Sequence, residues 1–334
     1  MTRGEAVQQS MMTLETALSA LAPRLVPGAT EALDVRRLSG GASQETWAFR
    51  VGDRDLILRR RPPGATGSGN AVGLATEAAL IRAAAAKGAP VPEVVHVCTE
   101  EDGIGEAYVM GKVEGETLGA RIVRNEAFAA VRPKLAGQCG AVLAQIHAID
   151  PATAPALNTS DARSELEKYE TVYRTVGPER PIFEAAFRWL KDRAPVLETP
   201  TLLHGDFRNG NIMFQPEAGV AAVLDWELAH LGDPAEDLAW ICVNSWRFGG
   251  TKPVGGFGDY AQLLEGYEAA GGKPVALERV LYWQTLGSLK WGCMCLTMYA
   301  SFASGADASV ERAMIGRRTS ETEIDLIALL ERAQ

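Results

Sequence analysis

The stretch LLHGDFRNGNIMF, residues 202–214, places a histidine, an aspartate, an arginine and two asparagines between two apolar ends. The apolar ends are typical of short β-strands, and the polar centre predicts a loop between them. The segment GVAAVLDWELAHLGD, residues 219–233, repeats this order of strand and loop. Because two strands joined by a short turn bring their ends together, we expect Asp206, Asn211 and Asp225 to line one pocket.

The side chains of this predicted pocket favour metal and hydroxyl chemistry. A carboxylate and an amide oxygen are hard ligands that suit Mg²⁺, which makes Asn211 and Asp225 candidate metal ligands. A second carboxylate, that of Asp206, can orient or deprotonate an attacking hydroxyl. The alternative is a loop of Asx turns with solvated acids. The intervening strand, His204 and the LDWE motif favour the pocket.

Three motifs, HGDFRNGN, VLDWE and GDPAEDLAW, resemble those of the aminoglycoside phosphotransferase family, a branch of the protein-kinase-like fold. The resemblance covers residues 34–240 by motif. The C-terminal GRRTSETEIDLIALL also resembles the subgroup whose members include kinase-like domains fused to acyl-CoA dehydrogenases. The resemblance implies an ATP- and Mg²⁺-dependent phosphotransferase that acts on the hydroxyl of a small molecule.

The order of the expected elements agrees with an α+β, bilobal protein-kinase-like fold. Short β-rich runs dominate up to residue 111, where TWAFRV and DLILRR flank a GDR turn and a helix is expected over 71–87. Helical spacing dominates afterwards, with helices expected over 160–175 and 181–194. We therefore expect a small antiparallel-sheet N-lobe that binds nucleotide, residues 1–111, and a larger, mostly helical C-lobe for catalysis and substrate binding, residues 112–334.

The resemblance also implies roles for single residues of the C-lobe. Asp206 would accept or orient the proton of the substrate hydroxyl, and Arg208 falls where many protein kinases carry a catalytic-loop lysine. Asn211 and Asp225 would hold Mg²⁺. Asp237 would brace the catalytic loop by accepting backbone N–H bonds, and we interpret His204 as a buried support of that loop rather than a proton shuttle.

The strand DLILRRRP is expected to bind phosphate. Strand alternation places Ile57 and Arg59 on one face, and Arg59 stands where the family usually has lysine. Arginine keeps the charge but is longer and planar, so the geometry of the phosphate contact can differ. Glu77 lies at the edge of the apolar face of its helix, and we expect it to pair with Arg59. The alternative is that residues 59–61 are solvated charges on an edge strand.

Two more groups of residues are implied for nucleotide binding. The loop LSGGASQETW would cover the phosphates, although the glycines alone equally fit a plain hairpin turn. The segment AYVMGKVEG resembles the connection between lobes, whose backbone would contact the purine edge. The residues concerned are Gly40, Gly41 and Ser43 in the loop, and Met110, Gly111 and Val113 in the connecting segment.

Composition limits the other classes. The 334 residues carry a net charge of −9, which argues against a general nucleic-acid binder. The longest uncharged run, residues 291–306, is too short for a membrane helix and predicts a buried helix, and the N-terminus does not resemble a signal peptide. The five cysteines are interpreted as reduced core thiols of a cytoplasmic protein. The oligomeric state is not predicted.

The phosphate acceptor stays open at this point. The C-terminal resemblance favours a hydroxyacyl compound, including its CoA thioester, whose phosphates Arg317 and Arg318 could meet unless they form surface ion pairs. An aminoglycoside or macrolide antibiotic, a choline-like compound and a sugar are the alternatives. Because Arg59 replaces lysine, a nucleotide-binding module without turnover is a further hypothesis. A metal phosphohydrolase would need more ligands than the four histidines provide at suitable spacing.

Overall fold

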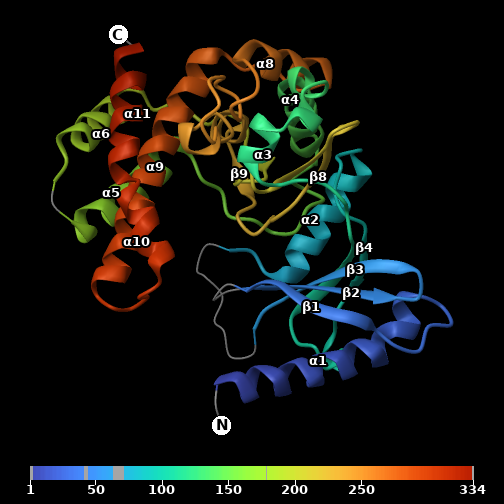
Figure 1. Ribbon diagram of the computed structural model, residues 1–334. Coiled ribbons are helices and arrows are strands. Elements are labelled where there is room, and N and C mark those ends of the chain that lie inside the picture. The colour runs from blue at the N-terminus through green and yellow to red at the C-terminus, as the bar shows by residue number, and fades with distance from the viewer. Residues whose placement is uncertain (1–2, 41–43, 63–70, 178, 333–334) are drawn as a thin grey trace. The chain divides into compact units, whose positions relative to one another are not determined.

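The computed structural model describes residues 3–40, 44–62, 71–177 and 179–332. The chain folds into two compact units, which can be followed in Figure 1. The first unit comprises Met1–Glu114 with Ala222–Ala229, and the second comprises Gly115–Ala221 with His230–Gln334. The short segment that carries Asp225 thus belongs to the first unit, and the division after residue 111 stays a prediction. Within the first unit, the Val223 N–H donates to the Pro90 carbonyl at 2.8 Å.

A five-stranded antiparallel sheet forms the centre of the first unit, in the order β1-β2-β3-β5-β4. Its strands are β1 (Leu33–Gly40), β2 (Glu45–Val51), β3 (Arg54–Arg60), β4 (Val94–Val97) and β5 (Ala107–Gly111), and a short 3₁₀ helix, η1 (Glu100–Asp102), precedes β5. Strands β2 and β3 are the predicted hairpin. Their turn needs a left-handed residue, which Gly52 supplies with a φ of 59°.

Two helices cover opposite faces of this sheet. Helix α1 (Arg3–Leu25) lies along one face in Figure 1, where Leu14 and Leu18 share a buried cluster with Trp47 and Leu58. Since side chains alternate along β3, Arg59 points to the other face. Helix α2 (Leu74–Ala86) lies on that side, within the predicted range 71–87. Alternation along β3 thus places Leu56 and Leu58 toward α1 and Arg59 toward the face on the α2 side.

Helices dominate the second unit. They are α3 (Gly119–Arg124), α4 (Leu135–His147), α5 (Ala162–Val176), α6 (Pro181–Arg193), α7 (Pro234–Trp240), α8 (Tyr260–Ala269), α9 (Leu277–Ala303), α10 (Val310–Arg317) and α11 (Thr319–Arg332), with 3₁₀ helices η2 (Glu126–Phe128), η3 (Arg132–Lys134) and η4 (Asn244–Trp246). Strand β6 (Thr201–Leu203) pairs with β9 (His230–Gly232), and β7 (Ile212–Gln215) pairs with β8 (Gly219–Val223). The predicted helices over 160–175 and 181–194 are confirmed as α5 and α6.

Glycines allow α4 and α8 to pack with their backbones in contact. A Cβ atom on Gly140 would lie 2.0 Å from the Leu263 carbonyl oxygen, so no larger residue fits there without displacing the helix. This close packing places His147, at the end of α4, beside Tyr267 of α8. The His147 Nδ1 and the Tyr267 hydroxyl are 2.9 Å apart.

The apolar run 291–306 begins inside α9, whose buried residues lie between Val280 and Leu296. The run was predicted to form a buried helix, and the structure confirms a helix that becomes partly exposed beyond Leu296. No helix in the described part of the chain is both long and apolar enough to cross a membrane.

Candidate active site

A buried aspartate of the second unit braces the loop that carries Asp206. The Asp237 carboxylate, on α7, accepts the backbone N–H groups of His204 at 2.7 Å and Gly205 at 2.9 Å. Asp237 is fully buried. Burial by itself raises the pKa of Asp237, but the hydrogen bond from His147 and the nearby His204 hold this pKa below its usual value. The predicted brace is therefore confirmed.

His204 supports the same loop from inside. Its side chain is fully buried, and its Nδ1 atom accepts the Asp206 N–H at 3.2 Å. The ring meets Phe207 edge-on, with centroids 6.2 Å apart. Gly205 has a φ of 81°, a left-handed conformation that lets His204 turn inward while Asp206 turns outward. The predicted supporting role of His204 agrees with these contacts.

Three side-chain donors surround the Asp206 carboxylate. Its Oδ1 atom accepts Arg208 Nε at 2.9 Å and Trp240 Nε1 at 2.6 Å. Its Oδ2 atom accepts Asn211 Nδ2 at 2.6 Å. The structure thus brings together Asp206, Arg208 and Asn211, which the sequence analysis grouped. It adds Trp240, which that analysis left out.

Asn211 is oriented by Asp206. Its Nδ2 atom donates both to the Asp206 carboxylate and to the Asp206 carbonyl, the latter at 3.0 Å. Since both bonds use the amide nitrogen, the Oδ1 oxygen is the atom suited to a cation. The neighbouring Asn209 is fully buried and donates to the carbonyls of Trp246 and Gly255, each at 2.8 Å. These bonds fix the loop on both sides of Gly210.

Arg208 is held over an aromatic ring. Its guanidinium carbon lies 4.4 Å from the ring centroid of Trp246, within the range of a cation–π interaction. Its Nη1 atom donates to the Asn209 carbonyl at 3.1 Å. Together with the bond to Asp206, these contacts fix a side chain that is otherwise flexible.

Arg59 is the centre of a second polar group, which belongs to the first unit. Its Nη2 atom lies 2.8 Å from Asp225 Oδ1 and 3.6 Å from Glu77 Oε2, and it also donates to the Gln44 side-chain carbonyl. The predicted pair of Arg59 with Glu77 is therefore present. The alternative of solvated edge charges is wrong for Arg59, because its side chain is only 13% exposed.

Glu77 is fully buried at the base of this group. Burial raises its pKa to about 7, against the opposing pull of Arg59. Gln44 Nε2 donates to Glu77 Oε1 at 2.8 Å, and the Tyr108 hydroxyl donates to Oε2 at 3.3 Å. Neither Gln44 nor Tyr108 was predicted, because each lies far from Glu77 in the sequence.

Asp225 has an unusual backbone conformation. Its φ is 66°, in the left-handed region, which aspartate tolerates better than most residues. The Val72 N–H donates to the Glu227 carbonyl at 2.8 Å, and Gln44 Nε2 lies 3.1 Å from the Glu227 carboxylate. These bonds hold segment 222–229 beside Arg59. The prediction that Asp206, Asn211 and Asp225 line one pocket stays a prediction.

In the segment AYVMGKVEG, whose backbone was expected to contact the purine edge, two of the amides are already hydrogen-bonded within the protein. The Gly111 N–H donates to the Glu93 carbonyl at 2.9 Å, and the Lys112 N–H donates to the Asp55 carbonyl at 3.1 Å. These two amides hold β5 in place, so they are engaged within the unit. Among the three amides of residues 111–113, this leaves the Val113 N–H as the candidate donor to a purine. Met110 is buried in β5.

The predicted phosphate loop is described only in part. Gly40 ends β1, where it pairs with Glu45 of β2. Gly41 and Ser43 lie outside the described residues.

Trp240 is a site residue with a signal that sequence analysis could have used. It follows Asp237 by three positions on α7, and residues three apart share a helix face. Since Asp237 was expected to face the catalytic loop, Trp240 was bound to face it too. Lys290, whose ammonium lies over the Trp240 ring, had no such signal, because it comes 50 positions later on α9.

A family model described as Phosphotransferase enzyme family matches residues 34–282. Acyl-CoA dehydrogenase family member 10 of Mus musculus is 31% identical over 225 residues, which are 64% of this chain and 20% of that protein. The chain spans about a fifth to two fifths of the length of the first such curated relatives, between 20% and 38%. The likeness to acyl-CoA dehydrogenase family members confirms the predicted subgroup.

Solved structures confirm the protein-kinase-like fold. A Ralstonia eutropha protein described as an aminoglycoside phosphotransferase superposes with a TM-score of 0.75 at 22% identity, over 95% of this chain and 98% of that one. A thermostable mutant of an aminoglycoside phosphotransferase, in a ternary complex with AMP-PNP and hygromycin B, gives a TM-score of 0.59 at 18% identity, over 93% and 97% of the two chains. The predicted α+β architecture, a small sheet unit and a larger helical unit, is therefore confirmed.

Proposed function

The chain belongs to the phosphotransferase enzyme family, and we propose that it transfers the γ-phosphoryl group of ATP to the hydroxyl of a small molecule. The observation that carries this proposal is the Asp206 carboxylate. Three side chains fix it at the surface of a loop that Asp237 braces. A carboxylate held in this way can align an acceptor hydroxyl and take its proton as the phosphoryl group leaves ATP.

ATP as donor is supported by the family and by the related structure that holds AMP-PNP. We propose that Arg59 contacts the phosphates, with Gly40, Gly41 and Ser43 near them. Arg59 Nε is buried and has no hydrogen-bond partner among the described residues, so a phosphate oxygen would satisfy it. Glu77 then serves to orient Arg59, and Met110 and the Val113 amide would contact the purine.

We propose that the side-chain oxygens of Asn211 and Asp225 would hold Mg²⁺. A carboxylate and an amide oxygen form a donor set that suits this ion. When bound, Mg²⁺ neutralises charge on the phosphate oxygens that are transferred. Asp206 keeps Asn211 oriented through its two hydrogen bonds, and Arg59 meets Asp225 at 2.8 Å. Asp206 and Arg59 thus each position one proposed Mg²⁺ ligand and also take part in the proposed reaction themselves.

For the acceptor we favour a hydroxyacyl compound, including its CoA thioester. The relatives named as acyl-CoA dehydrogenase family members support this class. The aromatic group beside Asp206 also argues against a cationic acceptor, because the chain's own cations already cover its rings. These pairs are Lys290 over Trp240 at 5.1 Å, Arg208 over Trp246 at 4.4 Å and Arg318 over Trp291 at 5.8 Å.

The expected role of Arg318 toward substrate phosphates has weaker support. Arg318 Nε lies 3.0 Å from the Glu321 carboxylate, three residues later, and its guanidinium lies over Trp291. These contacts agree with the alternative of a surface ion pair. Aminoglycoside or macrolide phosphorylation remains the alternative activity, and nucleotide binding without turnover remains the alternative class.

Calorimetry with ATP, with and without Mg²⁺, tests the site first. We expect Mg²⁺ to tighten ATP binding by the wild-type protein, and Asp225→Ala to abolish this gain. Asp53→Ala, which changes an exposed aspartate in the β2–β3 turn, is the matched control and should behave as wild type. If the wild-type protein does not bind ATP, the proposed function is wrong.

Acceptor-dependent release of ADP then separates the alternatives. The panel contains hydroxyacyl-CoA thioesters, the free hydroxy acids, an aminoglycoside, a macrolide and choline. Turnover with the thioesters or hydroxy acids supports the favoured class. Turnover with an antibiotic alone contradicts it. Tight Mg²⁺-dependent ATP binding without turnover of any hydroxyl compound would favour the non-catalytic module.

A further inference from the structure

The Trp240 indole lies directly against the candidate catalytic carboxylate. Its Nε1 atom donates to Asp206 Oδ1 at 2.6 Å, a short bond between a neutral donor and a carboxylate. Trp240 is 7% exposed and ends α7, the helix that also carries the Asp237 brace. One short helix therefore fixes both the backbone before Asp206 and the Asp206 side chain.

Helix α9 holds the Trp240 ring in place from the other side. A Cβ atom on Gly287 would lie 3.1 Å from Trp240 Cε3 and 2.9 Å from a methyl of Val243, so glycine leaves the space that the indole fills. The Lys290 ammonium, one helical turn later, lies 5.1 Å from the Trp240 ring centroid. The ring is thus confined by packing and by a cation.

Lys290 is itself fixed by buried acids. Its Nζ atom lies 3.6 Å from Glu165 Oε2 and 3.7 Å from Glu236 Oε1. It also lies over the Tyr169 ring at 5.5 Å. An ammonium that is only 13% exposed and has two carboxylate partners has little freedom to move, because leaving them would separate largely buried charges. Lys290 is therefore a rigid neighbour for Trp240.

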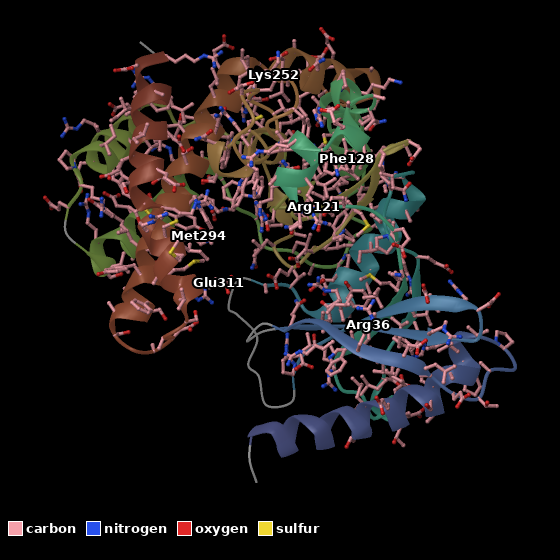
Figure 2. All side chains as sticks on the ribbon, in the orientation of Figure 1. Arg36, Arg121, Phe128, Lys252, Met294 and Glu311 are labelled. Carbon is pink, nitrogen blue, oxygen red and sulfur yellow. The ribbon has the colours of Figure 1, made fainter. Side chains whose placement is uncertain are left out.

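Two other tryptophans provide an internal comparison. Trp246 and Trp291 continue from Trp240 as a packed group, with successive ring centroids 5.4 Å and 4.9 Å apart. Both are more than nine-tenths buried, and neither indole N–H has a hydrogen-bond partner among the residues that the structure describes. Met294, labelled in Figure 2, packs against this group from α9. Aromatic packing alone thus does not require an indole N–H bond, whereas Trp240 makes one to Asp206.

We propose that Trp240, confined between Gly287 and Lys290, is a positioning residue that fixes the Asp206 carboxylate for phosphoryl transfer. This inference rests on the proposed function. Arg208 and Trp240 both donate to Oδ1, and Asn211 donates to Oδ2, so the carboxylate is held against rotation in a single orientation. Without the indole N–H, the carboxylate gains freedom that lowers the fraction of productive encounters with the acceptor.

Trp240→Phe tests this role, because it removes the indole N–H and keeps an aromatic ring. We expect kcat to fall about 10- to 100-fold, with the KM values for ATP and acceptor within about threefold of wild type. Trp291→Phe is the matched control, since it removes an equally buried indole whose N–H lacks a partner. If both variants lose the same turnover, the proposed role of Trp240 is wrong. A wild-type protein without turnover would instead overturn the proposed function itself.

A second measurement does not depend on activity or on the stability of Trp240→Phe. In ¹H–¹⁵N spectra of the indole groups of the seven tryptophans, Asp206→Ala, which removes the acceptor, should shift one signal strongly. Trp240→Phe, if folded, identifies this signal by its loss. If Asp206→Ala leaves every indole signal in place, the hydrogen bond to Asp206 is absent and the inference fails.

Discussion

Asp206→Asn should lower kcat by about 10²- to 10⁴-fold, the usual effect of removing a positioned acid or base. The structure shows why this small change has a large effect. An amide can keep its oxygen toward Arg208 and Trp240, which both donate to Oδ1. The amide nitrogen must then face Asn211 Nδ2. In the wild-type protein Asn211 Nδ2 donates to Asp206 Oδ2 at 2.6 Å, so in the variant two donors would oppose each other.

The expected decrease in kcat has a chemical part and a structural part. A 10²- to 10⁴-fold decrease corresponds to about 2.7–5.5 kcal/mol in the barrier. The lost hydrogen bond between Asn211 and the carboxylate is worth about 1.5–3 kcal/mol, because the acceptor is charged. Asn211 keeps its second bond, to the Asp206 carbonyl at 3.0 Å, so it should hold its place. We therefore expect ATP affinity in Mg²⁺ to stay within about tenfold of wild type.

Two assays measure these quantities separately. Acceptor-dependent ADP release under saturating substrate gives kcat, and calorimetry gives the affinity for ATP with Mg²⁺. Asp192→Asn, at an exposed position of α6, is the control for a change from aspartate to asparagine. Full turnover by Asp206→Asn would remove Asp206 from the mechanism. A loss of ATP affinity as large as the loss of kcat would show that Asp206 acts on the nucleotide instead of the acceptor.

Three further predictions concern the groups around the site. Arg59→Met should weaken ATP binding by about 10- to 100-fold in calorimetry because a charge-assisted bond is lost, whereas Arg59→Lys should keep most of the affinity. Equal ATP affinity of the wild type and both variants would contradict a phosphate contact. Because the folded-state pKa of Glu77 is raised to about 7, the free energy of unfolding should fall as pH rises from about 4.5 through 7, and Glu77→Gln should flatten this decline. Urea unfolding at pH 5 and 8 measures both proteins, and an unchanged pH dependence would show that Glu77 does not titrate in this range. Asp237→Asn should lower the free energy of unfolding by about 3–5 kcal/mol in urea unfolding, because a buried charge with several partners is lost. An effect as small as that of Asp192→Asn would show that Asp237 does not stabilise the loop.

The sequence was sufficient where one residue has a local pattern or a fixed place in a motif. The Asp237 brace is implied by the resemblance of the motif GDPAEDLAW, and the place of Glu77 at the edge of its helix's apolar face follows from its position three and four residues before Leu80 and Ile81. The hairpin of β2 and β3 follows from alternation around GDR. In each case the information lies within one element or one turn.

The contacts that the sequence could not predict join elements far apart in the chain. Gln44 meets Glu77 across 33 positions, and Lys290 meets Glu165 from a different helix. No periodic pattern specifies such pairs, because the distance along the chain does not fix the distance in space. The amides of Gly111 and Lys112 illustrate the same limit, since their partners on Glu93 and Asp55 depend on the register of the sheet.

We propose that the arginine at position 59 is a phosphate ligand and not a sign of lost activity. All three acceptors around it, on Gln44, Glu77 and Asp225, are met by Nη2. A lysine would serve these acceptors with its single ammonium, so they do not by themselves require arginine. What arginine adds is Nε, which is buried without a partner among the described residues. An unsatisfied buried donor costs about 1–3 kcal/mol, and a bound phosphate would remove this cost. The unpartnered Nε of Arg59 therefore supports the proposal that this site binds an anion.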